Sequence, residues 1–297
     1  MFGFRPDGRR LKGLDPILQM SPYIMPKRVD AQVWTPQDVD YDKMAAYIQD
    51  QRSKGRNISF MSIIIAGYVR VVATYPDINR FVVNKQIFAR KDIVVSFMVL
   101  KRNADIGVEA AAVKIIFEPN ETLFEVSEKV EQAIEENRKP PVEGINLTEQ
   151  IARFLLSIPV LPTVIIGFLK FLDRFGLMPS IIYKASPFHT GLFVTNMGSL
   201  GMNNVYHHIY DFGTTSIFTS MGRIKRVPHI TSKGEVQAKR ILPMATVVDE
   251  RIGNGACYAR VLSLWKHLAE NPHLLETPPD EIHYERRIAH EWEKKKA

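Results

Sequence analysis

Apolar residues recur at helical spacing in several stretches of this chain, at 40–52, 59–75, 122–137 and 256–268. In 122–137, Leu123, Val126, Val130 and Ile134 fall on one face, with acids and lysines on the other. That pattern is typical of an amphipathic helix packed on a core. The 59–75 stretch is more apolar and is followed by Pro76, which ends the predicted helix.

Other stretches are rich in β-branched residues and predict strands at 93–101, 108–117, 192–196, 215–221 and 240–248, with Asp105 and Gly107 marking a turn between the first two. Helices and strands alternate irregularly, and no internal repeat is present. We therefore predict an α/β fold in which helices cover a mixed β-sheet. Lys139-Pro140-Pro141 is too short for a tether between domains, so residues 1–279 are predicted to form one domain. The charged and aromatic tail at 280–297 is predicted to be a solvated helix or a frayed end.

Residues 154–169 carry no charge, within a longer apolar helical segment at 151–183. The run contains Pro159 and Pro162 and is shorter than the roughly 20 residues that span a bilayer. Two interpretations remain open. The run forms buried or pocket-lining helices inside the domain, or it is an interfacial segment, flanked by Arg153 and Lys170, that contacts an acyl group or a membrane.

The composition narrows the class of partner. Hydrophobic residues make up 45% of the 297 residues, and the net charge is +7, which favours anionic partners such as coenzyme A or acidic lipid. The charges are scattered, so we expect no nucleic-acid partner. Cys257 is the single cysteine, which excludes an internal disulfide or a thiolate-rich metal site and fits a reducing cytoplasm. No secretory signal is recognisable at 1–13, so we expect a cytoplasmic protein, with membrane association as an alternative.

The common phosphate-loop, dinucleotide-binding, zinc-protease and hydrolase signatures are missing from the sequence. The run Asp249-Glu250-Arg251-Ile252-Gly253-Asn254-Gly255-Ala256 lies between a predicted strand and a predicted helix. It resembles the Asp-His-Arg-x-x-Asp-Gly-Ala signature of the catalytic domain of 2-oxo acid dehydrogenase acyltransferases. Further landmarks follow the order of that family: Val39-Asp40, Tyr75-Pro76-Asp77-Ile78-Asn79, Thr195-Asn196-Met197-Gly198 and Met221-Gly222-Arg223-Ile224.

The resemblance implies a chloramphenicol acetyltransferase-like fold and a homotrimer, or a multiple of it, with each site in a channel between subunits. It implies coenzyme A or acyl-coenzyme A as substrate, a small-molecule thioester as partner, and no metal. The signature His of the family acts as general base and is replaced here by Glu250. Thr195 matches the hydroxyl that donates to the oxyanion, and Asn254 matches the signature Asp. Arg251, Gly255 and Asn196 fall at substrate-binding positions. The lipoyl and subunit-binding domains of complex-forming relatives have no counterpart in this sequence, so we expect no covalent lipoyl group on the chain, and the resemblance does not imply a place in a dehydrogenase complex.

Glu250 is the departure that decides the functional prediction. A carboxylate with a pKa near 4.3 is a weaker base than an imidazole near 6.5, a deficit of about a hundredfold in rate unless burial retunes it. Three histidines are therefore candidates for a substitute base: His189, upstream of the Thr195 strand, and the pair His207-His208 downstream of it. Cys257 is a further candidate nucleophile, although free cysteines more often act as small buried hydrophobes.

The leading hypothesis is a coenzyme A-dependent acyltransferase with Glu250 as an atypical base. The first alternative is a catalytically silent trimer that binds a ligand or serves as a scaffold. The second alternative is a lipid acyltransferase at a membrane surface, in contact with the membrane through 154–169.

Overall fold

The computed structural model describes residues 4–100, 110–138 and 157–285. The helices are α1 (Pro16–Ile24), α2 (Tyr41–Ser53), α3 (Phe60–Thr74), α4 (Leu123–Arg138), α6 (Leu161–Phe175), α7 (Ser180–Ala185) and α8 (Gly255–Glu270). The strands are β1 (Phe4–Arg5), β2 (Gly8–Arg10), β3 (Gln32–Asp40), β4 (Arg80–Val83), β5 (Gln86–Arg90), β6 (Ile93–Leu100), β7 (Ala110–Phe117), β8 (Leu192–Asn196), β9 (Ile217–Met221), β10 (Lys225–Ile230) and β11 (Val236–Asp249).

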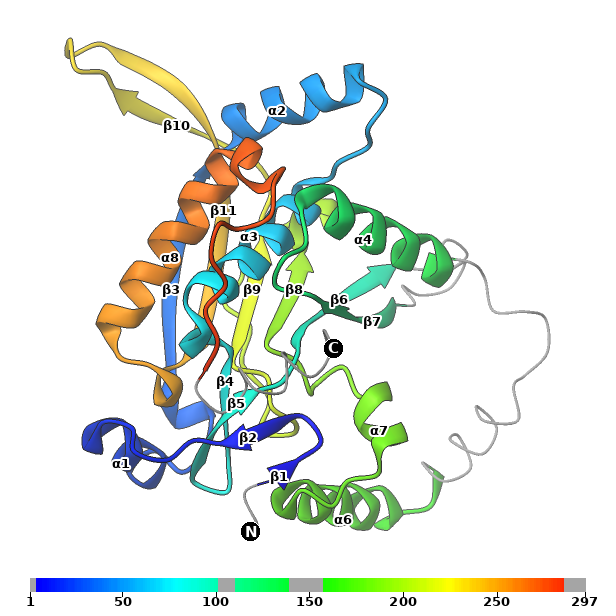
Figure 1. Cartoon of the computed structure of the whole chain (residues 1–297). Coiled ribbons are helices and arrows are strands. Elements are labelled where there is room, and N and C mark those ends of the chain that lie inside the picture. The colour runs from blue at the N-terminus through cyan, green and yellow to red at the C-terminus, as the bar shows by residue number, and fades with distance from the viewer. Residues whose placement is uncertain (1–3, 101–109, 139–156, 286–297) are drawn as a thin grey trace.

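The larger sheet is mixed and has the strand order β10-β11-β9-β8-β6-β7, with β3 also paired to β11. β8 runs parallel to both β6 and β9, and the other pairs are antiparallel. A smaller sheet, β1-β2-β5-β4, lies below it (Figure 1). The predicted fold class, a mixed sheet covered by helices, is confirmed.

Helices α3, α4 and α8 cover one face of the larger sheet and enclose the main hydrophobic core (Figure 1). Ser59 caps α3, because its hydroxyl accepts a hydrogen bond from the backbone N–H of Ser62. Gly67 lets α3 approach α8, since a Cβ there would lie 2.9 Å from the Trp265 ring. The indole of Trp265 donates a hydrogen bond to the Ile64 carbonyl and ties the two helices together. These packed helices are the support on which the turn after β11 is held.

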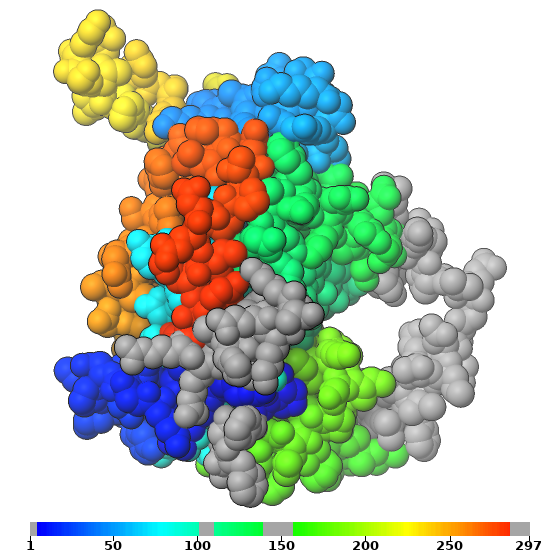
Figure 2. Space-filling model, viewed as in Figure 1, coloured from blue at the N-terminus to red at the C-terminus, as the bar shows by residue number. Residues whose placement is uncertain are grey.

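Most of the predicted elements appear close to their predicted bounds, including β8 at 192–196. The predicted turn at Asp105 and Gly107 and the break at Lys139-Pro140-Pro141 lie outside the described residues. β11 is longer than predicted because it forms a hairpin with β10, which stands clear of the body (Figure 2). Residues 280–285 are not helical: the His283 N–H donates to the Ala73 carbonyl, and Arg80 pairs with Glu285. An ion pair and a backbone hydrogen bond thus dock 280–285 onto the body, where a solvated helix or a frayed end was predicted. The rest of the predicted tail, 286–297, lies outside the described residues.

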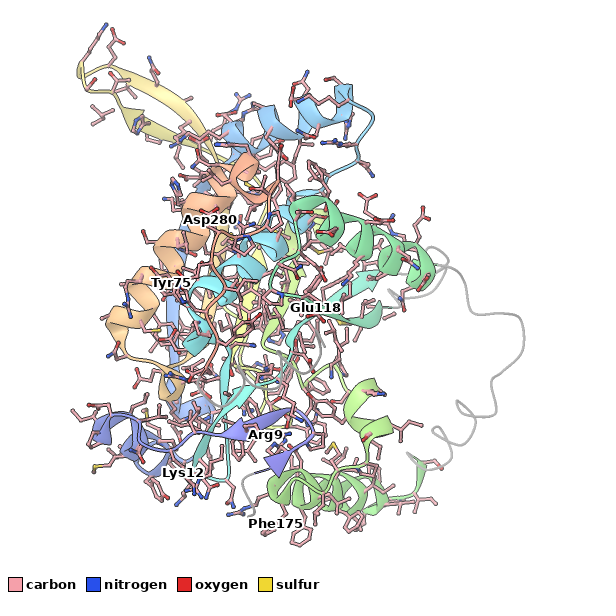
Figure 3. All side chains as sticks on the ribbon, viewed as in Figure 1. Arg9, Lys12, Tyr75, Glu118, Phe175 and Asp280 are labelled. Carbon is pink, nitrogen blue, oxygen red and sulfur yellow. The ribbon has the colours of Figure 1, made fainter. Side chains whose placement is uncertain are left out.

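The apolar run at 154–169 becomes part of α6, which begins at Leu161; residues 154–156 lie outside the described residues. Of the residues in α6, only Asp173 is buried. Val164, Phe168 and Phe171 are each more than half exposed, and Phe175 lies at the outer edge of the molecule (Figure 3). Of the predicted buried or pocket-lining helices, α6 is not buried, because it packs through its Asp173 side and leaves its aromatic side uncovered. It does line a pocket, through Lys170, Asp173 and Arg174.

Candidate functional site

The Asp249–Gly255 segment joins β11 to α8 and is fixed by hydrogen bonds from its own first residue. Asp249 is fully buried and accepts from both the backbone N–H (3.2 Å) and Nε (2.7 Å) of Arg251 through Oδ1, and from Nη2 (2.7 Å) through Oδ2. The Tyr258 hydroxyl donates to the Asp249 carbonyl at 2.6 Å. Asn254 caps α8 by accepting the Cys257 N–H. A short turn with this many hydrogen bonds holds its side chains in fixed directions.

Arg251 points into the protein interior. Its guanidinium forms a bidentate pair with Asp249 and donates to the carbonyls of Met25 and Pro26. Arg28 approaches the same carboxylate, with Nε 3.4 Å from Asp249 Oδ2. Burial and the neighbouring Arg251 charge lower the pKa of Arg28, and Asp249 opposes that change. Arg251 was predicted to bind substrate, and the structure places it in this buried Arg-Asp-Arg cluster.

Glu250 points the other way, into an open groove of about 870 Å³. Its side chain is exposed, and no residue in the described part of the chain hydrogen-bonds to its carboxylate. Gly255 and Asn254 line the same groove. The remaining lining is largely apolar and comes from α1, β3, the end of β11 and the start of α8: Ile17, Leu18, Ile24, Met25, Val33, Val248, Ala259 and Leu262. Asp15 also lines the groove, but its carboxylate caps α1 by accepting the N–H groups of Ile17 and Leu18. The groove thus offers the Glu250 carboxylate beside a surface suited to an acyl chain.

Thr195 lies near the end of β8, on the sheet face that the main helices do not cover. Its Oγ1 is buried and has no hydrogen-bond partner among the described residues. An unsatisfied buried hydroxyl is uncommon and costs free energy, so it calls for an explanation. The next residue, Asn196, lines a separate cavity of about 320 Å³ and accepts the Ser199 N–H through its side chain.

Glu250 and Thr195 of one chain lie toward opposite ends of the sheet. Thr195 pairs with Ser220, and Ser220 pairs with Ala245 on β11. Glu250 lies five positions beyond Ala245, and the four strand positions up to Asp249 alone, at about 3.3 Å per residue, separate the two by more than roughly 13 Å along the strands. The two predicted catalytic groups therefore cannot act on one substrate atom within a single chain.

The candidate substitute bases are engaged elsewhere. His189 is fully buried before β8, with Nδ1 2.8 Å from the Ser186 hydroxyl and Nε2 3.4 Å from Asp173. His207 stacks on Phe218 at 4.2 Å between ring centroids, and its Nδ1 lies 2.9 Å from the carbonyl oxygen of His208, whose own side chain is exposed. Neither His189 nor the pair lines the groove that holds Glu250.

Cys257 is buried, and its thiol donates to Asp77 at 3.2 Å. Burial, followed by the Asp77 charge, raises the pKa of the Cys257 thiol to about 12. A thiol that stays protonated at neutral pH is a poor nucleophile. Within the described residues, no cluster of three or more His, Cys, Asp or Glu could hold a metal ion, and no helix there is long and apolar enough to cross a membrane.

Sequence reasoning did not find two contributions to the site. The first is the apolar wall that α1 supplies to the groove through Ile17 and Ile24. The second is Arg28, which completes the cluster around Asp249. The Asp15-Pro16 pair is a helix-start signal for α1, but no local signal links Arg28 to a turn far along the chain.

Comparison with known proteins finds one family model and several similar folds. The family model of the 2-oxoacid dehydrogenases acyltransferase (catalytic domain) matches residues 187–277, which include both Thr195 and Glu250. The lipoamide acyltransferase component of the mitochondrial branched-chain alpha-keto acid dehydrogenase complex of Bos taurus is 33% identical over 79 residues. That match covers 27% of this chain and only 16% of the relative.

Solved structures resemble almost the whole chain. A probable dihydrolipoamide acetyltransferase of Listeria monocytogenes has a TM-score of 0.54 at 12% identity, over 88% of this chain and 94% of that one. The dihydrolipoamide acetyltransferase of Azotobacter vinelandii gives 0.54 at 12%, over 89% and 94%. The cubic core of a pyruvate dehydrogenase multienzyme complex gives 0.54 at 11%, over 90% and 94%. The chain has the fold of these acyltransferase cores, and the predicted resemblance to the acyltransferase catalytic domain is confirmed.

Proposed function

We propose that this protein is a coenzyme A-dependent acyltransferase whose sites form where two copies of the chain meet. The proposal rests on one observation: the two predicted catalytic side chains, Thr195 and Glu250, each lack an interaction that the other could supply. The Thr195 hydroxyl is buried and has no hydrogen-bond partner in the described part of the chain, and Glu250 is an exposed carboxylate at the far end of the sheet. A second copy of the chain that places its Glu250 opposite Thr195 would bring the base and the hydroxyl donor into one site.

Exposed apolar side chains support an oligomer, which we propose to be a homotrimer or a multiple of it. Ile17 on α1 is 80% exposed, Trp34 on β3 61%, and Val236 in the protruding hairpin 71%. Ile17 lines the groove together with Ile24 and Val33, which are 71% and 38% exposed. A contiguous exposed apolar surface is typical of an interface with another chain. The similar cubic core is itself an assembly of many chains.

The proposed chemistry needs a base and an oxyanion donor. Glu250 accepts the proton of a thiol or hydroxyl acceptor as that group attacks the thioester carbonyl carbon. The carbonyl oxygen becomes an oxyanion and accepts a hydrogen bond from Thr195 Oγ1. Collapse breaks the carbon–sulfur bond, and the departing coenzyme A thiolate takes the proton back from Glu250. The apolar wall of the groove would hold the acyl chain.

The test is release of free thiol from acetyl- and longer acyl-coenzyme A by the full-length protein. Glu250→His restores an imidazole and should raise the rate by about a hundredfold, because a base near pKa 6.5 replaces one near 4.3. Thr195→Ala should lower the rate by about a hundredfold. Glu281→His, at a side chain that is 77% exposed, is the matched control and should change nothing. No turnover by the native protein or Glu250→His at any chain length would contradict the proposal.

The silent alternative predicts a different result from the same samples. Thermal stabilisation by coenzyme A without turnover would favour a ligand-binding or scaffold protein, since a ligand at about a hundredfold excess over its Kd stabilises the native state by about 2.7 kcal/mol.

A membrane-surface lipid acyltransferase is the second candidate, and one observation favours it. Val164, Phe168, Phe171 and Phe175 form an exposed apolar stripe on α6, and Lys170 and Arg174 on the same helix are cationic. Such helices bind acidic membrane surfaces. Phe168→Asp/Phe171→Asp should abolish co-sedimentation with phosphatidylglycerol vesicles, and Ile230→Asp/Val236→Asp in the exposed hairpin should not. Equal co-sedimentation of both double variants would contradict contact through α6.

A further inference from the structure

Another cavity, of about 340 Å³, lies on the Arg251 side of the turn that carries Glu250. We call it the cationic pocket. Its wall holds six basic side chains against two carboxylates: Lys27, Arg28, Lys85, Lys170, Arg174 and Arg251 against Asp173 and Asp211. These residues come from separate parts of the chain: the segment after α1, the β4–β5 turn, α6 and the Asp249 turn. Convergence of like charges on one cavity is unfavourable unless an anion offsets it.

The lysines of the cationic pocket are not neutralised by the residues described. None of Lys27, Lys85 and Lys170 forms an ion pair with another described residue. Lys85 lies over the Tyr23 ring at 5.5 Å. Among the described residues, Arg174 donates only to the neutral amide oxygen of Asn84. Their charges therefore remain available to a ligand.

Both carboxylates of the cationic pocket already interact with other groups of the protein. Asp211 accepts the backbone N–H of Arg28 at 3.0 Å. Asp173 pairs with Arg5 at 2.5 Å and lies 3.4 Å from His189. Neither carboxylate forms an ion pair with Lys27, Lys85 or Lys170 in the described part of the chain.

The floor of the cationic pocket is rigid. Arg28 is only 5% exposed, and its Nη atoms donate to the carbonyls of Tyr210, Val82 and Gly213. Its Nε is buried and has no hydrogen-bond partner among the described residues. This Nε lies 3.4 Å from Asp249 Oδ2, and Asp249 also pairs with Arg251, so Asp249 compensates the floor. The charges left for a ligand are those of Lys27, Lys85, Lys170 and Arg174, which line the cationic pocket above this floor.

We propose that the cationic pocket binds a phosphate group. A carboxylate is satisfied by one arginine, whereas a phosphate has more acceptor oxygens and up to two charges, which suits several cations that converge from different directions. The site goes beyond the proposed acyl transfer and does not depend on it. Two sources share this chemistry, a soluble phosphate ester and the headgroup of a lipid, because α6 supplies Lys170 and Arg174 and also carries the exposed apolar stripe.

The experiment titrates inorganic phosphate into the full-length protein by calorimetry. Lys85→Ala/Lys170→Ala removes two exposed cations from the cationic pocket without touching its buried floor, and should weaken binding by about tenfold or more. Lys225→Ala/Lys233→Ala in the hairpin is the matched control and should bind as the native protein does. Absence of saturable binding by the native protein, equal affinity in the Lys85/Lys170 variant, or equal weakening in the control would each overturn the proposal.

Vesicles distinguish the two sources. If phosphatidylglycerol vesicles bind the native protein, release it on addition of inorganic phosphate and fail to bind the Lys85/Lys170 variant, the phosphate belongs to a lipid headgroup. If inorganic phosphate binds in a lysine-dependent manner and vesicles do not compete, the source is a soluble phosphate ester. Both outcomes support a phosphate site.

Discussion

The groove beside Glu250 and the cationic pocket behind Arg251 are lined by adjacent residues of one turn, yet they differ in charge and burial. Glu250 is exposed in an apolar groove, and Arg251 is buried among other cations. Asp249 precedes both residues, and its hydrogen bonds to the backbone and guanidinium of Arg251 keep Arg251 turned inward and Glu250 turned toward the groove. A single buried carboxylate thus separates a surface suited to an acyl chain from one suited to an anion.

Removal of the Asp249 charge should have the largest effect on stability, because this carboxylate fixes the turn between the groove and the cationic pocket. Asp249→Asn removes the carboxylate that pairs with both buried guanidinium groups, Arg28 and Arg251, and leaves Arg28 with the Asp211 charge alone. The free energy of unfolding should fall by about 3–5 kcal/mol. Urea denaturation at neutral pH measures the loss. Asp42→Asn, at an exposed pair with Arg240, should cost less than about 1 kcal/mol. Similar losses in the two variants would show that the cluster around Asp249 does not hold the turn.

Asp173, which lines the cationic pocket, should make the stability of the protein depend on pH. Burial alone would raise the pKa of Asp173, but His189 and Arg5 hold it below its usual value. A depressed folded-state pKa means that the stabilisation is present above the unfolded value, near 4, and is lost as pH falls through the folded value. Asp173→Asn should therefore cost about 2 kcal/mol at pH 7, and the stabilities of native protein and variant should converge in acid. Parallel stability curves down to the lowest pH would contradict this.

The sequence predicted well those elements whose own residues carry the signal. α3 shows helical spacing with Ser59 at its start, and β8 is a short β-branched run. β3 was missed because Pro36 interrupts its pattern; the strand tolerates that proline because it lies at an edge and pairs only with β11.

Other features depend on residues far apart in the sequence, and local patterns do not contain them. The apolar run in α6 carries no information on whether another element covers it. In the same way, nothing near Arg251 in the sequence indicates that Arg28 and Asp249 will bury it, so the signature run predicted its position and not its surroundings.

The position of Thr195 relative to Glu250 gives the last test, which asks whether the groove is completed by another copy. Glu250→Ala and Thr195→Ala should each have little acyltransferase activity alone. Co-expressed in equal amounts, they should regain about a quarter of the native activity, because random assembly leaves that share of interfaces with both groups intact. Co-expression of Glu250→Ala with the Glu250→Ala/Thr195→Ala double variant is the control and should recover nothing, since no copy supplies the carboxylate. If the first mixture is as inactive as the control, Thr195 of one copy and Glu250 of another do not share a site. The Thr195 hydroxyl, which has no hydrogen-bond partner among the described residues, would then need a different explanation.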